Sequence, residues 1–297
     1  MRKLDVPTND ALAVYDLCVQ SVSDATLQQT YASNRVHVAP AVADFDTASQ
    51  TASWANLPRV PNGNPGVVIA GTLTKKELTD LYSTYMVGAS GTSRKVYDDI
   101  LVAAGGLCPF CGGLGHVHTL DHYLPKSNFP VYSVLPANLV PCCRDCNTGK
   151  GAAFGHHAHD QTLHPYLDND KYFDERWVTA AVSLTDPILI TFACSPPVGW
   201  TDVEKSRSQK HFESYALGYR FSVQAGAELS RLLDLRRNSL RRLSPASFRD
   251  YLVDYAHSGS FDLNGWSRTM YTALAETPWF CQADFSDPAW PLVGAAP

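Results

Sequence analysis

The chain has 297 residues, enough for one large domain or two of moderate size, and 45% of them are hydrophobic. This composition indicates a folded protein with a core and excludes a largely disordered chain. The net charge of −5 argues against a uniformly basic nucleic-acid binder. No segment approaches the roughly 20 apolar residues that span a bilayer. The start of the chain has two basic residues without an apolar run behind them, so we expect no signal peptide and a cytoplasmic protein.

The first third of the sequence predicts mainly helices. Apolar residues recur at helical spacing over residues 10–21, behind a polar start. A loop rich in Pro and Gly at residues 57–66 precedes a short apolar run, VVIAG, that reads as a strand. Thr74 and Glu77 form a predicted capping box at the start of a helix that runs to about residue 87. A further helix is expected over about residues 93–104.

Five of the eight cysteines fall in two clusters, CPFC at 108–111 and CCRDC at 142–146. Without an export signal, paired Cys-x-x-Cys elements predict metal ligands rather than disulfides. Two such pairs supply the four thiolates of a tetrahedral zinc site: Cys108, Cys111, Cys143 and Cys146. The alternative is two coincidental pairs of buried thiols.

Beyond the cysteines, RWVTAAVSL and PILITFACS predict two strands joined as a hairpin through Thr-Asp-Pro. Thr201 and Glu204 suggest a second capping box, followed by helix to about residue 242, and Ser244-Pro245 starts another helix. We therefore expect an α+β protein with three regions: a mainly helical N-terminal region (1–92), a metal-bearing core (93–167) and a hairpin-plus-helices C-terminal region (168–297).

Residues 203–243 are basic although the whole chain is acidic. They contain nine Lys and Arg against four acidic residues, a net charge of +5. Such a segment can attract a polyanion. An ordinary solvated helix face explains the same pattern.

Polar residues with hydrolytic chemistry lie between and beside the two cysteine pairs. Asp121-His122 and Asn138 fall inside the 31-residue gap, and Asn147 follows the last cysteine. Because a zinc site would hold both ends of this segment, these side chains can converge. Hydrolysis of a phosphodiester needs a base for the water, a cation for the phosphate and a group that orients the base.

Three further residues are candidates for substrate contact. Lys126 follows the Asp121-His122 pair, Lys150 follows Asn147, and His164 lies further on in LHPYLD. For each lysine alone, a solvated side chain is the alternative.

The stretch LDHYLPKS…NLVPCCRDCNTGKG, between paired cysteines, resembles the HNH (His-Me finger) endonucleases. The resemblance covers about residues 105–152 and implies a ββα-metal core with structural zinc. It implies that His122 is the general base and that Asn138 braces the loop carrying it. Asp121 and Asn147 would hold the catalytic ion. Asn147 replaces the family's usual His, a form also found in the HNH domains of CRISPR effector nucleases, which favours Mg²⁺ or Mn²⁺.

The function implied is that of a metal-dependent endonuclease, with DNA favoured over RNA and no membrane partner. The layout is similar to HNH subunits of bacterial anti-phage systems such as Septu and some retron-linked systems. That similarity implies a defence effector working with an ATPase or other activating subunit. Two alternatives remain: a catalytically silent, zinc-stabilised nucleic-acid-binding module, and an HNH toxin subunit that cleaves tRNA or other RNA.

Overall fold

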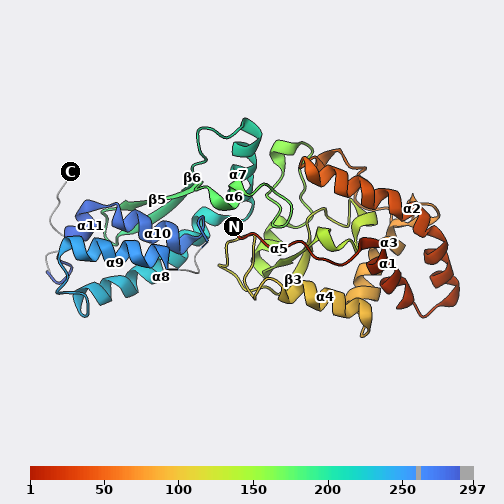
Figure 1. The fold of residues 1–297 in the computed structure, drawn as a ribbon, viewed down its shortest axis with the longest axis horizontal. Helices are drawn as coiled ribbons and strands as arrows, with labels where there is room; N and C mark the ends of the chain where they lie inside the picture. Colours follow the sequence, from red (N-terminus) through yellow and green to blue (C-terminus); the bar gives the residue numbers. More distant parts are fainter. Residues whose placement is uncertain (259–261, 288–297) are drawn as a thin grey trace. The chain divides into compact units, whose positions relative to one another are not determined.

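The computed structural model describes residues 1–258 and 262–287 of the chain, drawn in Figure 1. These residues form a mixed α+β protein, as predicted. The chain divides into two compact units. The N-terminal unit comprises Arg2–Asn169 and Asp202–His211, and the C-terminal unit comprises Met1, Asp170–Thr201 and Phe212–Pro297. The expected helical region and metal-bearing core therefore belong to one unit.

The N-terminal unit begins with helices that start at well-formed caps. The Asp10 carboxylate accepts a hydrogen bond from the Ala13 N–H at 2.7 Å, and the predicted capping box of Thr74 and Glu77 is formed. The helices are α1 (Ala11–Gln20), α2 (Ala25–Gln50), α3 (Lys75–Tyr82) and α4 (Thr92–Val102). A π-helical turn, η2 (Ser83–Val87), extends α3, and β1 (Val68–Ala70) pairs with β2 (Leu73–Thr74). Short 3₁₀ turns lie at Trp54–Asn56, Pro130–Tyr132, Pro136–Asn138 and Ala158–Asp160.

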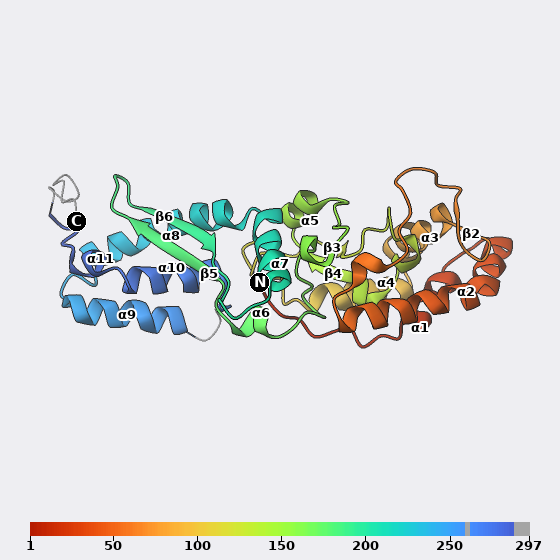
Figure 2. The same cartoon turned by 90° about the horizontal axis from the view of Figure 1, so that it is seen from above.

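Two strands and a helix follow in the same unit. Strand β3 (Thr119–His122) pairs antiparallel with β4 (Leu139–Cys142), with His122 opposite Leu139. Helix α5 (Arg144–Lys150) begins directly after β4. Leu120 and Leu139 join the hydrophobic core formed by α1, α3 and α4, so the strands are anchored by apolar packing. Figure 2 shows β3, β4 and α5 beside one another.

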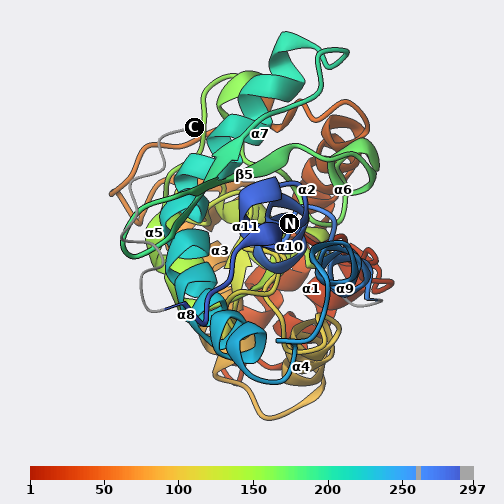
Figure 3. The ribbon, with the colours of Figure 1, turned by 90° about the vertical axis from the view of Figure 1, so that its left-hand side faces the viewer.

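The C-terminal unit contains the predicted hairpin and its helices. Strand β5 (Val178–Ser183) pairs antiparallel with β6 (Leu189–Cys194). Helix α8 (Leu217–Arg237) packs against β6, and α10 (Trp266–Ala275) packs against β5 and α9 (Pro245–His257). Figure 3 looks onto these helices. The shorter helices are α6 (Lys171–Asp174) and α11 (Pro278–Gln282). Ser244 caps α9 as predicted.

The helix expected from Thr201 to about residue 242 is divided into two helices in the structure. Helix α7 (Asp202–Ser214) ends before α8, and Ala216 between them has a φ of 49°, which breaks the helix. Arg207 and Arg236 are buried. The Arg236 guanidinium donates to the carbonyl of Leu240, so it serves the fold and not a surface. Within the described residues, no helix is both long and apolar enough to cross a membrane.

Candidate metal centre and hydrolytic site

Four buried cysteine side chains converge where α5 begins. The Sγ atoms all lie within 4.8 Å of one another, and those of Cys111 and Cys143 are 4.0 Å apart; the four are Cys108, Cys111, Cys143 and Cys146. A tetrahedral site with metal–sulfur bonds of about 2.3 Å places its sulfurs about 3.8 Å apart. The cluster can therefore hold a metal ion.

The four thiols lie within hydrogen-bonding reach of one another, and the Gly115 N–H donates to Cys111 Sγ at 3.3 Å. Hydrogen bonds from neighbouring thiols lower the pKa of Cys108, whereas hydrogen bonds to Cys108 raise the pKa of Cys111 and of Cys146. Cys142 is also buried, but its thiol donates to the Cys143 carbonyl at 3.3 Å and lies outside the set of four. The four predicted ligands are thus the ones the fold gathers.

His122 lies at the end of β3 with one ring nitrogen fixed. Its Nε2 lies 2.9 Å from the Ser133 carbonyl oxygen, which can only accept, so Nε2 carries the proton. The side chain contacts the Tyr82 ring edge to face, with centroids 4.3 Å apart. Burial lowers the pKa of His122 to about 3, and the nearby charges of Lys126 and Lys150 act in the same direction. The imidazole is therefore neutral at pH 7, with Nδ1 as the nitrogen able to accept a proton.

Asp121, beside His122, is joined to a buried lysine. The Lys150 ammonium donates to Asp121 Oδ2 at 2.8 Å and to the His122 carbonyl at 2.6 Å. The Lys150 side chain is 3% exposed and that of Asp121 is 8% exposed. Burial raises the pKa of Asp121, and the charge of Lys150 opposes that shift. Lys150 is therefore not the solvated lysine that was the alternative to phosphate contact, and its contact with a phosphate stays a prediction.

The Asn138 side chain joins two parts of the loop between β3 and β4 through hydrogen bonds to the backbone. Its Oδ1 accepts from the Leu124 N–H at 2.7 Å, and its Nδ2 donates to the carbonyls of Leu124 and Tyr132 at 3.1 and 3.0 Å. The side chain is wholly buried. Because Tyr123 and Leu124 directly follow His122, these bonds hold the backbone that carries the imidazole.

Asn147 lies on α5 and is half-buried. Its N–H donates to the Cys143 carbonyl at 3.0 Å. Residues three apart share a helix face, so Asn147 lies on the face of α5 from which Lys150 reaches Asp121. The role of Asn147 as a metal ligand stays a prediction.

The other two candidates for substrate contact differ in position. The Lys126 ammonium donates to Ser83 Oγ at 2.8 Å and lies 4.8 Å from the centre of the Tyr82 ring, the ring that also contacts His122. His164 is wholly buried, with its ring stacked on Trp54 and 4.2 Å from that of Tyr123. A side chain packed in this way belongs to the core and does not reach a substrate.

Two contacts of the site had no usable signal in the sequence. The Ser133 carbonyl that fixes the His122 tautomer is a backbone group, which every residue possesses. Tyr82 is buried, its ring packs on His122, and its hydroxyl donates to the Leu120 carbonyl at 3.1 Å.

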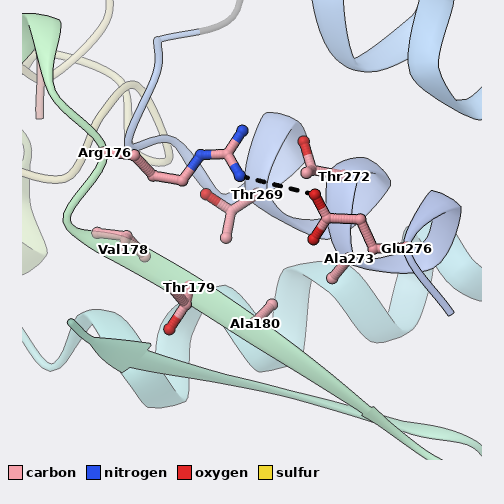
Figure 4. Close-up of a pocket in the computed structure, with 8 residues that line it drawn as sticks. All are labelled: Arg176, Val178, Thr179, Ala180, Thr269, Thr272, Ala273 and Glu276. Atoms are coloured by element: carbon pink, nitrogen blue, oxygen red, sulfur yellow. Dashed lines mark ion pairs between the residues drawn. The ribbon is translucent and has the colours of Figure 1, made fainter.

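Two hollows lie elsewhere in the described residues. One, of about 400 Å³, lies in the N-terminal unit between the loop at Asn62 and Gly63, the start of α3, Ser127 and Ala152. The other, of about 50 Å³, lies between β5 and α10 (Figure 4). There the Arg176 guanidinium spans to the Glu276 carboxylate, 4.0 Å away. The Thr269 and Thr272 hydroxyls at this small hollow are buried without a hydrogen bond, and the space suits water that would satisfy them.

The fold and the cysteine cluster define an α+β protein with a candidate metal centre. The chain is 30% identical over 289 residues to protein ea31 of Escherichia phage lambda, an alignment that covers 93% of this chain and 98% of that protein. The chain therefore belongs to the ea31 family. No protein-family model and no solved structure matches the sequence.

Proposed function

We propose that this protein is an HNH-type endonuclease that hydrolyses phosphodiester bonds, with DNA favoured as substrate. The observation that carries the proposal is the state of His122. It is a neutral imidazole with Nε2–H fixed on the Ser133 carbonyl, standing beside Asp121 at the end of a strand in a β–β–α succession. A general base must be neutral and correctly oriented at the working pH, and burial together with one backbone hydrogen bond provides both properties.

The four-cysteine cluster is assigned to structural zinc. Four thiolates close a tetrahedral site and leave no position for water or substrate, which is typical of a structural and not a catalytic ion. The cluster connects the segment before β3 to the start of α5, so it fixes the two ends of the β3–β4–α5 segment.

In the proposed reaction, His122 Nδ1 takes a proton from the attacking water. Asn138 keeps the loop behind His122 in register through its three backbone hydrogen bonds. Asp121 and Asn147 would hold Mg²⁺ or Mn²⁺, which would supply positive charge for the phosphate and the leaving 3′ oxygen. Lys126 adds positive charge on the Tyr82 side of the imidazole. The products would have 5′-phosphate and 3′-hydroxyl ends.

The test is the variant His122→Ala. We expect cleavage to fall by about 10²–10⁴-fold, the usual contribution of a positioned base. Purified protein would be incubated with plasmid, single-stranded DNA and tRNA, with and without Mg²⁺. The matched control is His118→Ala, an exposed histidine four residues earlier. Wild-type cleavage by His122→Ala, at unchanged zinc content, would place any nuclease activity elsewhere.

A second function is favoured by one observation, the pairing of Asp121 with Lys150. If that ammonium permanently holds the carboxylate, the protein is a silent, zinc-stabilised nucleic-acid-binding module. Such a module binds nucleic acid in a gel-shift assay and cleaves none of the three substrates at any Mg²⁺ concentration. Cleavage of tRNA alone would instead identify the RNA-cleaving toxin subunit.

The biological setting is proposed as defence, with the nuclease activated by an ATPase or another subunit. Protein ea31, the relative named above, is a phage protein, so the alternative setting is a nuclease that serves a phage during infection. Co-purification of the chain from its native host, followed by cleavage assays with and without the bound subunit and ATP, distinguishes a free enzyme from an activated one.

A further inference from the structure

Lys150 has a buried ammonium that pairs with a carboxylate inside the protein. The ammonium has two anionic or polar partners, Asp121 Oδ2 at 2.8 Å and the His122 carbonyl at 2.6 Å, and its side chain is 3% exposed. Lys150 is the last residue of α5, where the helix carbonyls favour a cation. The two hydrogen bonds and the end of α5 thus hold one positive charge beside Asp121, the proposed metal ligand, and beside the backbone of His122, the proposed base.

This arrangement balances the charge of Asp121 without any other cation. A buried carboxylate that lacks a counter-charge is costly, and the Lys150 ammonium supplies that counter-charge at 2.8 Å. A divalent cation that approaches Asp121 meets an ammonium already bonded to the same carboxylate. Like charges repel strongly in buried surroundings, so the ammonium and the ion compete for Asp121.

We propose that Lys150 is the resident counter-charge of Asp121, and that a divalent ion binds well only when this ammonium leaves for a substrate phosphate. The inference rests on the proposed nuclease function and adds its regulation. In the resting protein Lys150 holds the site in a weakly metal-binding state. When a phosphodiester arrives, the ammonium exchanges the Asp121 carboxylate for a phosphate oxygen, and the freed carboxylate becomes a ligand. Metal binding and substrate binding are then coupled.

The experiment measures the affinity of the zinc-loaded full chain for Mn²⁺ in the absence of nucleic acid. The protein is titrated with Mn²⁺, and the electron paramagnetic resonance signal reports the concentration of Mn²⁺ that stays free. Lys150→Met keeps the length and apolar stem of the side chain but removes the charge. We expect it to bind Mn²⁺ about tenfold more tightly, or better, than the wild type. Lys150→Arg keeps the charge and should bind no more tightly than the wild type. Lys126→Met removes a charge that does not bond to Asp121, and its affinity should change by less than about threefold.

A second arm tests the coupling. Adding a short phosphorothioate DNA that resists cleavage should raise the Mn²⁺ affinity of the wild type and leave that of Lys150→Met unchanged. Adding Asp121→Asn to Lys150→Met should abolish the gain. If Lys150→Met folds poorly, the rise in its melting temperature with Mn²⁺ is compared with that of the wild type, and a larger rise supports the proposal.

Equal or weaker Mn²⁺ binding by Lys150→Met overturns the inference, as does the absence of binding in every variant. These outcomes are separate from the failure of the nuclease function, because that function is decided by cleavage in the His122→Ala experiment. If Lys150→Met binds Mn²⁺ more tightly but the protein cleaves no substrate, the competition for Asp121 is supported and the nuclease function is rejected.

Discussion

His122 and Asp121 are neighbours in the chain, and burial disfavours the charged form of both, a cation for His122 and an anion for Asp121. For His122, loss of hydration favours the neutral ring, whereas for Asp121 it favours the protonated acid and is opposed by Lys150. The result is one group ready to accept a proton and one carboxylate whose charge depends on a partner. This division of roles between adjacent residues could not be read from the dipeptide Asp-His alone.

Asn138 provides a prediction at the same scale. Asn138→Ala leaves the Leu124 N–H and two carbonyls without their bonds inside the protein, which we expect to cost about 2–5 kcal/mol of unfolding free energy. Cleavage should fall less than in His122→Ala because the base is misoriented and not removed. The control is Asn128→Ala in the same loop, whose Nδ2 donates to the Val60 carbonyl. Chemical denaturation and plasmid cleavage measure the two effects, and a larger loss in the control would contradict the bracing role.

At the level of elements, the β3–β4 pair is only four residues long on each side. So short a pair is marginal by itself and needs support from other parts of the fold. It receives apolar packing from the N-terminal helices and, in the proposed function, a metal crosslink through the cysteines. The helices thus provide one support and the cluster the other.

Removing one thiol tests the second support. Cys143→Ser should lose the metal and destabilise the N-terminal unit, since structural zinc contributes about 10–16 kcal/mol of apparent folding free energy in small domains. Cys142→Ser is the matched control, because its sulfur is buried beside the cluster but belongs outside the four. Elemental analysis should find about one zinc per chain in the wild type and the control. Metal retained by Cys143→Ser, or disulfides among these cysteines in the wild type, would exclude the zinc assignment.

The arginines near the end of α8 give another prediction at this scale. Arg236 donates to the Leu240 and Leu243 carbonyls and lies 4.5 Å from the centre of the Phe248 ring, whereas Arg241 and Arg242 are exposed. Arg236→Glu should therefore lower the melting temperature by several degrees. The double variant Arg241→Glu/Arg242→Glu should fold normally. If these two arginines contact phosphates, it should also weaken DNA binding at every sequence and flatten the salt dependence.

Several elements were predictable because their signals are local. The capping box at Thr74, the cap at Ser244 and the hairpin around Thr-Asp-Pro depend on residues within a few positions of one another. The burial of Lys150, Arg207 and His164 was not predictable, because each depends on a partner far away in the chain. The four cysteines could be found because a metal imposes a spacing on its ligands, and backbone acceptors such as the Ser133 carbonyl could not.

At the scale of the whole molecule, the N-terminal unit contains three wholly or nearly buried histidines. Burial lowers the pKa of His122 and His211 to about 3 and that of His164 well below its usual value of 6.5. The unfolded chain therefore takes up these protons at higher pH than the folded one. The unfolding free energy they support is complete above about pH 6.5 and is lost as the pH falls towards 3.

We expect the melting temperature to fall steadily through that pH window. His211→Gln should make the decline shallower, because it removes one of the three groups. His118→Gln, which alters an exposed histidine, should leave the slope as in the wild type. Calorimetry between pH 4 and 8 provides the measurement, and a stability that does not change over this range would contradict the assignment of neutral buried histidines.

The discontinuity of the N-terminal unit has a consequence for synthesis on the ribosome. The chain leaves this unit after Asn169 and returns to it at Asp202, and only then supplies Arg207, which pairs with Asp168 through bonds of 2.6 and 2.7 Å. The two residues are 39 positions apart. At about 5–20 residues per second, Asp168 is made roughly 2–8 s before its partner. During that interval the nascent N-terminal unit contains an acidic group destined for the interior without its counter-charge, so its final packing must wait until part of the second unit has been translated.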